Sequence, residues 1–380
     1  MDDPLEITKE LIKIDTRNPP GITEEAVEYL QSLFSSYKTK VYRKVSNKPN
    51  LVVEISKGKP VLMLTSHLDT VPCEDKLLNP IIVNGKLYGR GACDAKGCVA
   101  AICSAALKAN PSIGLKLAFT ADEEVGGANG LGYVFPIERA DYVIIGEPKS
   151  IDSIGVMQAT VLSLDIVIKG ESGHTANHDI KKGAIYKASK FIMEMVEEFS
   201  KLRGEYNKFE EFFKSIGMEF EFKGHAVFNP AIIKGGIKRN VIANKCEIKA
   251  DIRISPWIDV KIVREMLNYS DLDVKVNGIL KPYGMLVDDV EIEKDLRLLN
   301  LLKSVVAKKF KPKAFCSLGV GDSRYVRKYG TPAFYYGPGG DSTLHSENEY
   351  VKIDELYGVA ENYKEIIETV SYTHLTLPTN

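Results

Sequence analysis

The sequence predicts an α/β protein in which a mostly parallel sheet is interrupted by a smaller, inserted ferredoxin-like α+β domain. Apolar runs of strand length alternate with helical segments over residues 1–159 and again over residues 282–370, which is the order of a parallel sheet. Between residues 160 and 281 the pattern changes to strands that alternate polar and apolar side chains. A chain of 380 residues is long enough to form both cores.

The larger domain begins with amphipathic helices and continues with buried strands. Asp3 is a suitable N-cap, and Pro4 a suitable first residue, for a helix that ends near Ile14. The other elements expected here are a helix at 24–34, strands at 50–55 and 61–65, a helix at 96–109, and strands at 115–120 and 142–145. Because active groups gather beyond the carboxyl ends of parallel strands, residues that follow these strands are the first candidates for a site.

The inserted domain, residues 160–281, has the element order β-α-β-β-α-β of a ferredoxin-like sandwich. Its expected elements are strands at 161–169, 226–234, 241–254 and 272–276 and helices at 183–202 and 260–268. An extra amphipathic helix is expected inside the insertion, between residues 203 and 224.

The α/β pattern resumes after the insertion and stops before the last ten residues. We expect a helix at 294–308, a strand at 332–336 and a closing helix at 353–370. Residues 371–380, which include His374, add no helical period and contain turn formers. We interpret them as a non-native tail and leave them out of the functional argument.

Composition and charge narrow the class of partner. The net charge is -1, so no global basic field favours nucleic acid or an anionic membrane surface. No apolar run approaches the roughly 20 residues that span a bilayer, and the first residues lack the features of a signal peptide. The six cysteines show no disulfide framework and no C-x-x-C zinc motif. We therefore expect a cytoplasmic protein without a nucleic-acid or membrane partner.

Histidine and carboxylate side chains occur in five turn-like contexts, and most of them follow apolar runs. Two histidines and three carboxylates form a mixed nitrogen and oxygen donor set that suits two divalent metals bridged by one carboxylate. This combination indicates metal-assisted hydrolysis. The contexts contain His67 and Asp69, Asp94, Glu123 and Glu124, Glu147, and His345.

The first context places His67 and Asp69 two residues apart after a strand, so their side chains share one side if the backbone stays extended. His67 can then bind a metal while Asp69 accepts its second N–H and fixes the tautomer. The alternative is a buried histidine that bonds to a strand-end aspartate without any metal. The other donor contexts favour the metal site.

The second and third contexts contain acidic residues next to glycines. Asp94 follows a glycine-rich segment, which lets the backbone approach two cations that a carboxylate can bridge. A dinucleotide loop is the alternative, but Asp94 stands where its third glycine would fall and would repel a phosphate. Glu123 and Glu124 are adjacent, so one of them can bind metal while the other moves a proton. An ordinary acidic turn is the alternative for this pair.

These motifs, in this order, resemble those of the M20 metallopeptidase family, which groups acetylornithine deacetylase, succinyl-diaminopimelate desuccinylase, aminoacylase and glutamate carboxypeptidase. The likeness covers about residues 3–370. The resemblance implies Glu123 as general base, Asp69 as the partner of His67, and a cis peptide after Asp94. It also implies two zinc sites, His67, Asp94 and Glu147 for one ion and Asp94, Glu124 and His345 for the other.

The insertion resembles the family's lid and dimerisation domain. The resemblance implies that His174 reaches the site of a partner subunit in a homodimer and stabilises the oxyanion there. Asn240 and Arg253 resemble lid positions that contact substrate, and Arg253 suits a bidentate contact with an α-carboxylate. Arg324 is a second carboxylate-binding candidate. A structural salt bridge is the alternative for either arginine.

The expected reaction is therefore hydrolysis of the amide bond of an N-acyl amino acid by an enzyme with two zinc ions, with cobalt or manganese as alternative metals. Glutamate at position 147 resembles the deacylase and carboxypeptidase branch, which favours activity like that of acetylornithine deacetylase or succinyl-diaminopimelate desuccinylase. The first alternative is a carboxypeptidase or dipeptidase that acts on short peptides. A metal-binding protein without catalysis is the alternative from another class, and the intact base at Glu123 argues against it.

Overall fold

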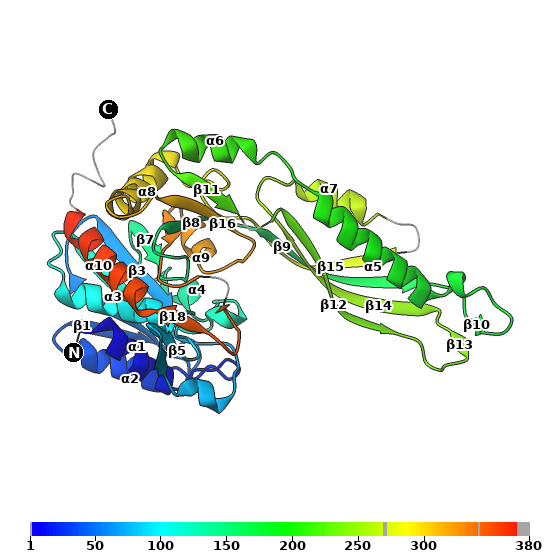
Figure 1. The fold of residues 1–380 in the computed structure, drawn as a ribbon, viewed down its shortest axis with the longest axis horizontal. Helices are drawn as coiled ribbons and strands as arrows, with labels where there is room; N and C mark the ends of the chain where they lie inside the picture. Colours follow the sequence, from blue (N-terminus) through cyan, green and yellow to red (C-terminus); the bar gives the residue numbers. More distant parts are fainter. Residues whose placement is uncertain (1, 223, 269–271, 341–342, 371–380) are drawn as a thin grey trace.

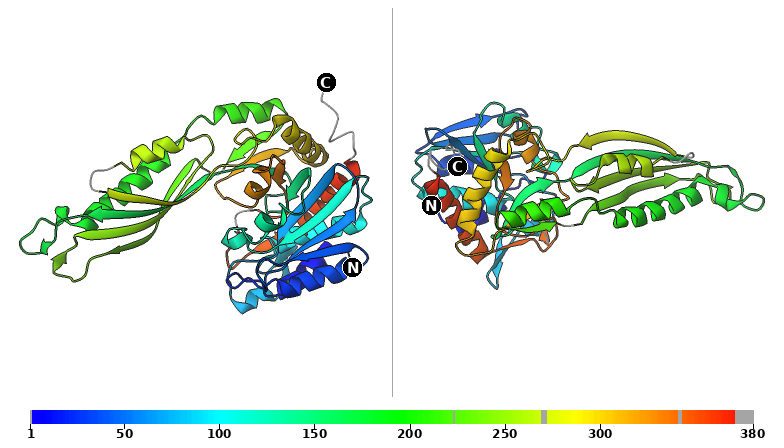
Figure 2. Two further views of the ribbon diagram at one scale, coloured as in Figure 1. Left: turned by 180° about the vertical axis from the view of Figure 1, so that it is seen from behind. Right: turned by 90° about the horizontal axis from the view of Figure 1, so that it is seen from above.

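The computed structural model describes residues 2–222, 224–268, 272–340 and 343–370, which form a larger and a smaller lobe (Figure 1). Both ends of the described chain lie in the larger lobe, and the smaller lobe extends from it as an arm (Figure 2). The predicted tail, residues 371–380, lies outside the described residues. No helix in the described part of the chain is long and apolar enough to cross a membrane.

The larger lobe is built on a nine-stranded sheet in the order β1-β2-β6-β3-β7-β17-β8-β16-β11. Most neighbouring strands are parallel, which confirms the predicted sheet type. Its strands are β1 (Lys38–Tyr42), β2 (Asn50–Ser56), β3 (Val61–His67), β6 (Gly114–Thr120), β7 (Tyr142–Ile145), β8 (Ser153–Gln158), β11 (Glu219–Phe222), β16 (Lys313–Ser317) and β17 (Ala333–Tyr335). A separate small sheet has β4 (Ile81–Val83), β5 (Lys86–Tyr88) and β18 (Tyr350–Lys352).

Helices cover both faces of the sheet because its strands are apolar on both sides. Leu62 and Leu64 of β3 belong to the main core, whereas Met63 belongs to a second core on the opposite face. The helices α1 (Pro4–Lys13), α3 (Lys96–Lys108) and α10 (Ile353–Thr369) contact one another on the main-core side. The other helices of this lobe are α2 (Glu24–Leu33), α4 (Leu131–Val134), α8 (Ile292–Val306) and α9 (Ser323–Arg327).

The smaller lobe confirms the predicted ferredoxin-like order. Its antiparallel sheet has the order β12-β14-β9-β15, with two helices between the strands. The buried residues of its long helix recur at helical spacing and face the sheet, at Ala184, Ala188, Phe191, Met195 and Phe199. The elements are β9 (Thr160–Lys169), α5 (Ala184–Lys201), β12 (Ala226–Gly235), β14 (Lys245–Ile254), α7 (Val260–Met266) and β15 (Leu272–Leu280).

Two details of the insertion differ from the sequence prediction. The expected strand 241–254 is interrupted: β13 (Val241–Ile242) pairs with β10 (Gly173–His174), and β14 begins only at Lys245. The expected extra helix is α6 (Asn207–Ser215), but the strand β11 that follows it leaves the small lobe and joins the edge of the large sheet. Because Phe220 of β11 stacks on Phe213 of α6, the two elements pack as one unit. The boundaries at residues 159/160 and 281/282 remain a prediction.

Candidate active site

The fold gathers the candidate residues at the carboxyl ends of adjacent strands. His67 is the last residue of β3, the Glu123–Glu124 turn follows β6, and Glu147 follows β7. These strands are neighbours in the order β6-β3-β7, so their ends lie side by side. Asp94 comes from the loop before α3, and the peptide bond after it is cis, as the family resemblance implies.

Asp94 lies between two groups of metal-ligand type. Its Oδ1 is 3.1 Å from Nε2 of His67, which is itself 3.6 Å from Oε1 of Glu147. Its Oδ2 is 3.1 Å from Nε2 of His345, which is 3.4 Å from Oε2 of Glu124. The donor atoms within each group all lie within 4.8 Å of one another. Each oxygen of Asp94 therefore serves a different group, which is the arrangement that a bridging carboxylate needs.

The charges of these groups fit divalent cations. Burial raises the pKa of Glu147 to about 8, and burial also raises the pKa of Glu123 well above its usual range. Hydrogen bonds to Asp94 and Glu124 raise the pKa of His345 to about 10, so a proton on this ring compensates part of the negative charge. Two cations would take over that role, and imidazole with carboxylate donors suits zinc, cobalt or manganese.

Glu123 is held at the edge of these groups by Asp69. The N–H groups of Glu123 and Glu124 donate to Oδ1 and Oδ2 of Asp69 at 3.1 and 3.2 Å. Nδ1 of His67 lies 2.9 Å from the main-chain oxygen of Asp69 and 3.6 Å from its carboxylate. The carbonyl is thus the nearer acceptor for the imidazole, and the carboxylate mainly orients the acidic turn and accepts from Asn18. The contact that the sequence predicts, between the imidazole and the Asp69 carboxylate, is the longer of the two.

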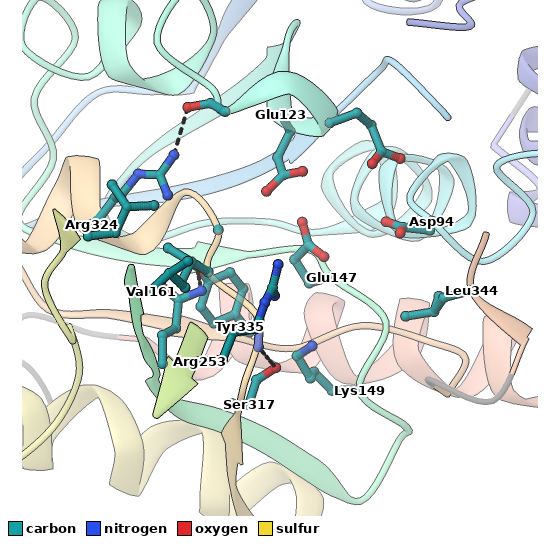
Figure 3. Close-up of a pocket in the computed structure, with 18 of the residues that line it drawn as sticks. Asp94, Glu123, Glu147, Lys149, Val161, Arg253, Ser317, Arg324, Tyr335 and Leu344 are labelled. Atoms are coloured by element: carbon teal, nitrogen blue, oxygen red, sulfur yellow. Dashed lines mark hydrogen bonds between the residues drawn. The ribbon is translucent and has the colours of Figure 1, made fainter. Parts of the chain in front are cut away.

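A pocket of about 460 Å³ lies beside the two donor groups, and Asp94, Glu123 and Glu147 line it together with Arg253 and Arg324 (Figure 3). Both arginines, which the sequence predicts as carboxylate-binding residues, line this pocket, and their role stays a prediction. Arg253 also forms a salt bridge with Asp251, which is the structural role given above as the alternative for this residue.

Two further candidates lie elsewhere. His174 and Asn240 are exposed at the outer end of the small lobe, near β10 and β13 (Figure 1). Nδ2 of Asn240 is 3.3 Å from Nε2 of His174. Neither residue lines the pocket of its own chain.

A buried ion pair between Glu349 and Arg90, which no sequence motif indicates, holds the loop that carries Asp94. Oε1 of Glu349 accepts the N–H groups of Cys93 and Asp94, both at 3.0 Å, and Oε2 accepts from Arg90 at 2.5 Å. Glu349 follows His345 by four residues, so this carboxylate connects the loop of a candidate metal-ligand histidine to the loop of Asp94. Burial raises the pKa of Glu349, which makes its ionised form dependent on these donors. No local motif marks it, because its partners are more than 250 residues away.

Replacing Glu349 with glutamine is expected to weaken metal binding by about 10- to 100-fold, because residues that orient a ligand loop contribute about that much to affinity. The substitution also leaves Arg90 without its carboxylate. Titration calorimetry with zinc measures the affinity, and chemical denaturation of the metal-free protein measures any loss of stability. Glu347→Gln, at an exposed position on the same loop, is the matched control and should bind zinc like the parent protein. Unchanged affinity in Glu349→Gln would contradict the positioning role.

A parallel α/β lobe that carries two histidine–carboxylate groups around one shared aspartate, with a further glutamate beside them, defines a metal-dependent hydrolase. Comparison of the sequence with protein families agrees with this class. Residues 63–369 match the model described as peptidase family M20/M25/M40, and the chain belongs to this family.

Similar proteins with assigned activities differ in substrate. The chain is 28% identical to a LysW-lysine/LysW-ornithine hydrolase of Sulfurisphaera tokodaii, over 96% of this chain and 94% of that protein. It is 25% identical to a probable succinyl-diaminopimelate desuccinylase of Staphylococcus epidermidis, over 96% and 97% of the two chains. Among solved structures, a tripeptidase from Staphylococcus aureus matches with a TM-score of 0.72 at 19% identity, covering 96% of this chain and 97% of that one. The protein is thus a metallohydrolase of amides or peptides.

Proposed function

We propose that the protein hydrolyses the amide bond of an N-acyl amino acid with the aid of two zinc ions, in the manner of an acetylornithine deacetylase or a succinyl-diaminopimelate desuccinylase. The observation that carries the proposal is the position of Glu123, a half-buried carboxylate that lines the same pocket as residues of both donor groups and belongs to neither group. The assigned relatives include a desuccinylase and a LysW-lysine hydrolase, which supports a substrate with an acylated amine.

The chain's own residues supply binding and proton transfer. His67, Asp94 and Glu147 would hold one cation, and Asp94, Glu124 and His345 the other. When bound, the two cations supply Lewis acidity, which polarises the substrate carbonyl and lowers the pKa of water. Glu123 accepts a proton from the attacking water and later donates it to the leaving amine nitrogen. Burial raises the pKa of Glu123 above its usual range, which favours uptake of the proton from the water.

The binding of the amino-acid part falls to the arginines of the pocket. Arg324 and Arg253 present guanidinium groups that match the planar geometry of an α-carboxylate. A carboxypeptidase or dipeptidase activity on short peptides would use the same contact and remains the second candidate, supported by the likeness to a tripeptidase fold. A binding protein without catalysis would not need a separate carboxylate at position 123.

A deacylation screen tests the proposed function directly. The zinc-, cobalt- and manganese-loaded protein is incubated with acetyl, succinyl and peptidyl amino acids, and the released amine is measured. We expect hydrolysis of N-acyl amino acids and loss of activity after chelation of the metal. Hydrolysis of peptides alone would favour the second candidate, and metal binding without hydrolysis of any member would refute the enzymatic proposal.

We also propose a homodimer that pairs the small lobes and brings His174 of each copy to the site of the other. His174 and Asn240 lie at the outer end of the arm, so a second copy is the source that could place them at a pocket. The outward side of α5 exposes a large apolar residue, Met193, with 73% of its surface accessible, and Tyr186 is exposed on the same helix. Apolar residues on an exposed helix face favour contact with another protein surface.

The variant His174→Ala is expected to lower kcat by about 10²- to 10³-fold without changing metal content, because it removes one donor to the oxyanion. The exposed neighbour His178 provides the control variant His178→Ala. Mixing His174→Ala with Glu123→Ala protein should restore activity, since mixed dimers contain one site with an intact Glu123 and a donated His174. A monomer in sedimentation experiments, or no restoration on mixing, would contradict the shared site.

A further inference from the structure

Three cationic side chains line the pocket, and they differ in what they contact. Arg253 donates from Nε to Oδ2 of Asp251 at 2.8 Å, so its charge has a carboxylate partner. Arg324 donates to the main-chain oxygen of Gly126 at 2.7 Å, and its side chain has no carboxylate in ion-pair contact among the described residues. Lys149 likewise has no hydrogen bond or ion pair from its ammonium group to any residue that the structure describes. Arg324 and Lys149 are therefore the two of these cations that have no carboxylate partner among the described residues.

The Lys149 side chain is held in place by packing. Its Nζ lies 5.8 Å from the ring centroids of both Phe315 and Tyr335. A Cβ at Gly155 would lie 2.8 Å from Cβ of Tyr335 and 3.4 Å from Cε of Lys149, so the absence of a side chain at this position leaves the room that both neighbours use. Lys149 is half-buried as a result. A packed stem presents the ammonium group at a defined place, which lowers the entropic cost of binding an anion.

The carboxylate that interacts electrostatically with Lys149 is a candidate metal ligand. Glu147 belongs to the donor group with His67 and Asp94, and burial raises its pKa while the charge of Lys149 acts to lower it. Glu147 is the nearest carboxylate along the chain to Lys149, and it would then be engaged with metal. The ammonium of Lys149, which lines the pocket, would then be open to a ligand carboxylate (Figure 3).

Lys149 and Arg324 also lie on different sides of the reacting centre. Arg324 is bonded to the turn that follows Glu123 and Glu124, whereas Lys149 follows Glu147 by two residues. Figure 3 shows the two cations on different sides of the Glu123 and Glu147 carboxylates. A substrate whose amide bond sits at Glu123 would extend toward Arg324 with one part and toward Lys149 with the other.

We infer that Lys149 is a specificity-determining residue that binds a second carboxylate, so that the preferred substrate is a linear amide with a carboxylate on each side of the scissile bond. One carboxylate is that of the amino acid, and the other ends the acyl group, as in the monoamide of a dicarboxylic acid. The inference rests on the proposed amide hydrolysis. Lys149 also disfavours the binding of peptides, because the ammonium group of a free amino terminus on the acyl side would be repelled by the like charge of Lys149.

The test uses a substrate series in which only the end of the acyl chain changes. N-succinyl, N-succinamoyl and N-(4-aminobutyryl) derivatives of one amino acid end in a negative, a neutral and a positive group at nearly the same length. The zinc-loaded protein should show a kcat/KM for the succinyl compound about 10- to 100-fold above that for the neutral one, as for a hydrogen bond between charged groups. The aminobutyryl compound should be the poorest substrate.

Variants then assign this preference to one residue. Lys149→Met keeps the length of the stem and should bring the succinyl and succinamoyl values to within about threefold of each other, because the charged partner is lost. Lys149→Arg should retain the preference. Zinc content is measured for each variant. If Lys149 acted only through the charge of Glu147, its loss would change metal binding and would lower kcat/KM for all three substrates together. Lys352→Met, at an exposed lysine outside the pocket, is the matched control.

Failure of the inference and failure of the proposed function give different results. If the protein hydrolyses the series without preference for the succinyl compound, or if Lys149→Met lowers kcat/KM equally for all substrates, the inference is wrong. The proposed amide hydrolysis is unaffected by that result. If no compound is hydrolysed, the proposed function fails. Calorimetry of the zinc-loaded protein with the succinyl and succinamoyl compounds then tests the anion site by itself. Equal affinities would then overturn the anion site, and tighter succinyl binding that Lys149→Met abolishes would support it.

Discussion

Replacing Glu123 with alanine is expected to lower kcat by about 10²- to 10⁴-fold, the range that a positioned general base contributes. The substitution should leave metal binding intact, because Glu123 belongs to neither donor group. Its neighbour Glu124 belongs to the group with Asp94 and His345, so Glu124→Ala should lose one metal ion as well as activity. Steady-state kinetics and metal analysis of the two variants therefore separate a proton-transfer role from a ligand role.

The matched control for this pair is Glu205→Ala, at an exposed glutamate between α5 and α6. It should retain the activity and the metal content of the parent protein. Full activity in Glu123→Ala would rule out this residue as the base. If Glu123→Ala loses metal while Glu124→Ala binds metal as tightly as the parent protein, the two glutamates have the opposite roles.

Replacing Asp94 with alanine is expected to disrupt both metal sites at once. Oδ1 of Asp94 serves the group with His67 and Oδ2 the group with His345, so each cation would lose one ligand. We also expect electrostatic repulsion between two unbridged cations. Activity should fall by at least about 10³-fold, since metal catalysis lowers the activation barrier by several kcal/mol.

Metal stoichiometry and kinetics measured over a range of zinc concentrations check this prediction. Glu147→Ala serves as the comparison, because Glu147 belongs to one group only and its loss should spare the ion near His345. If Asp94→Ala still binds two ions as tightly as the parent protein, Asp94 is not the bridge.

Much of the fold could be predicted from the sequence because its signals are local. The strand ends that carry His67 and Glu147 follow continuous apolar runs, and a buried strand in a parallel sheet has that pattern. The long helix of the insertion was predictable from apolar residues spaced three and four apart, and the same residues are buried against the sheet. Strand β11 was missed, because four residues that alternate Glu and Phe have no clear partner until β16 is placed beside them.

The sequence by itself determined the types of side chain at the site and their positions after strands, since strand ends and glycine turns leave a local pattern. Only the tertiary structure showed that Glu349 and Arg90 hold the loop of Asp94, because these residues are 259 positions apart and meet through packing of both chain ends. The same holds for Lys149, whose position depends on Gly155 and Tyr335 from two other strands. Contacts between residues far apart in the chain have no periodic signal, so they appear only when the sheet and its loops are assembled.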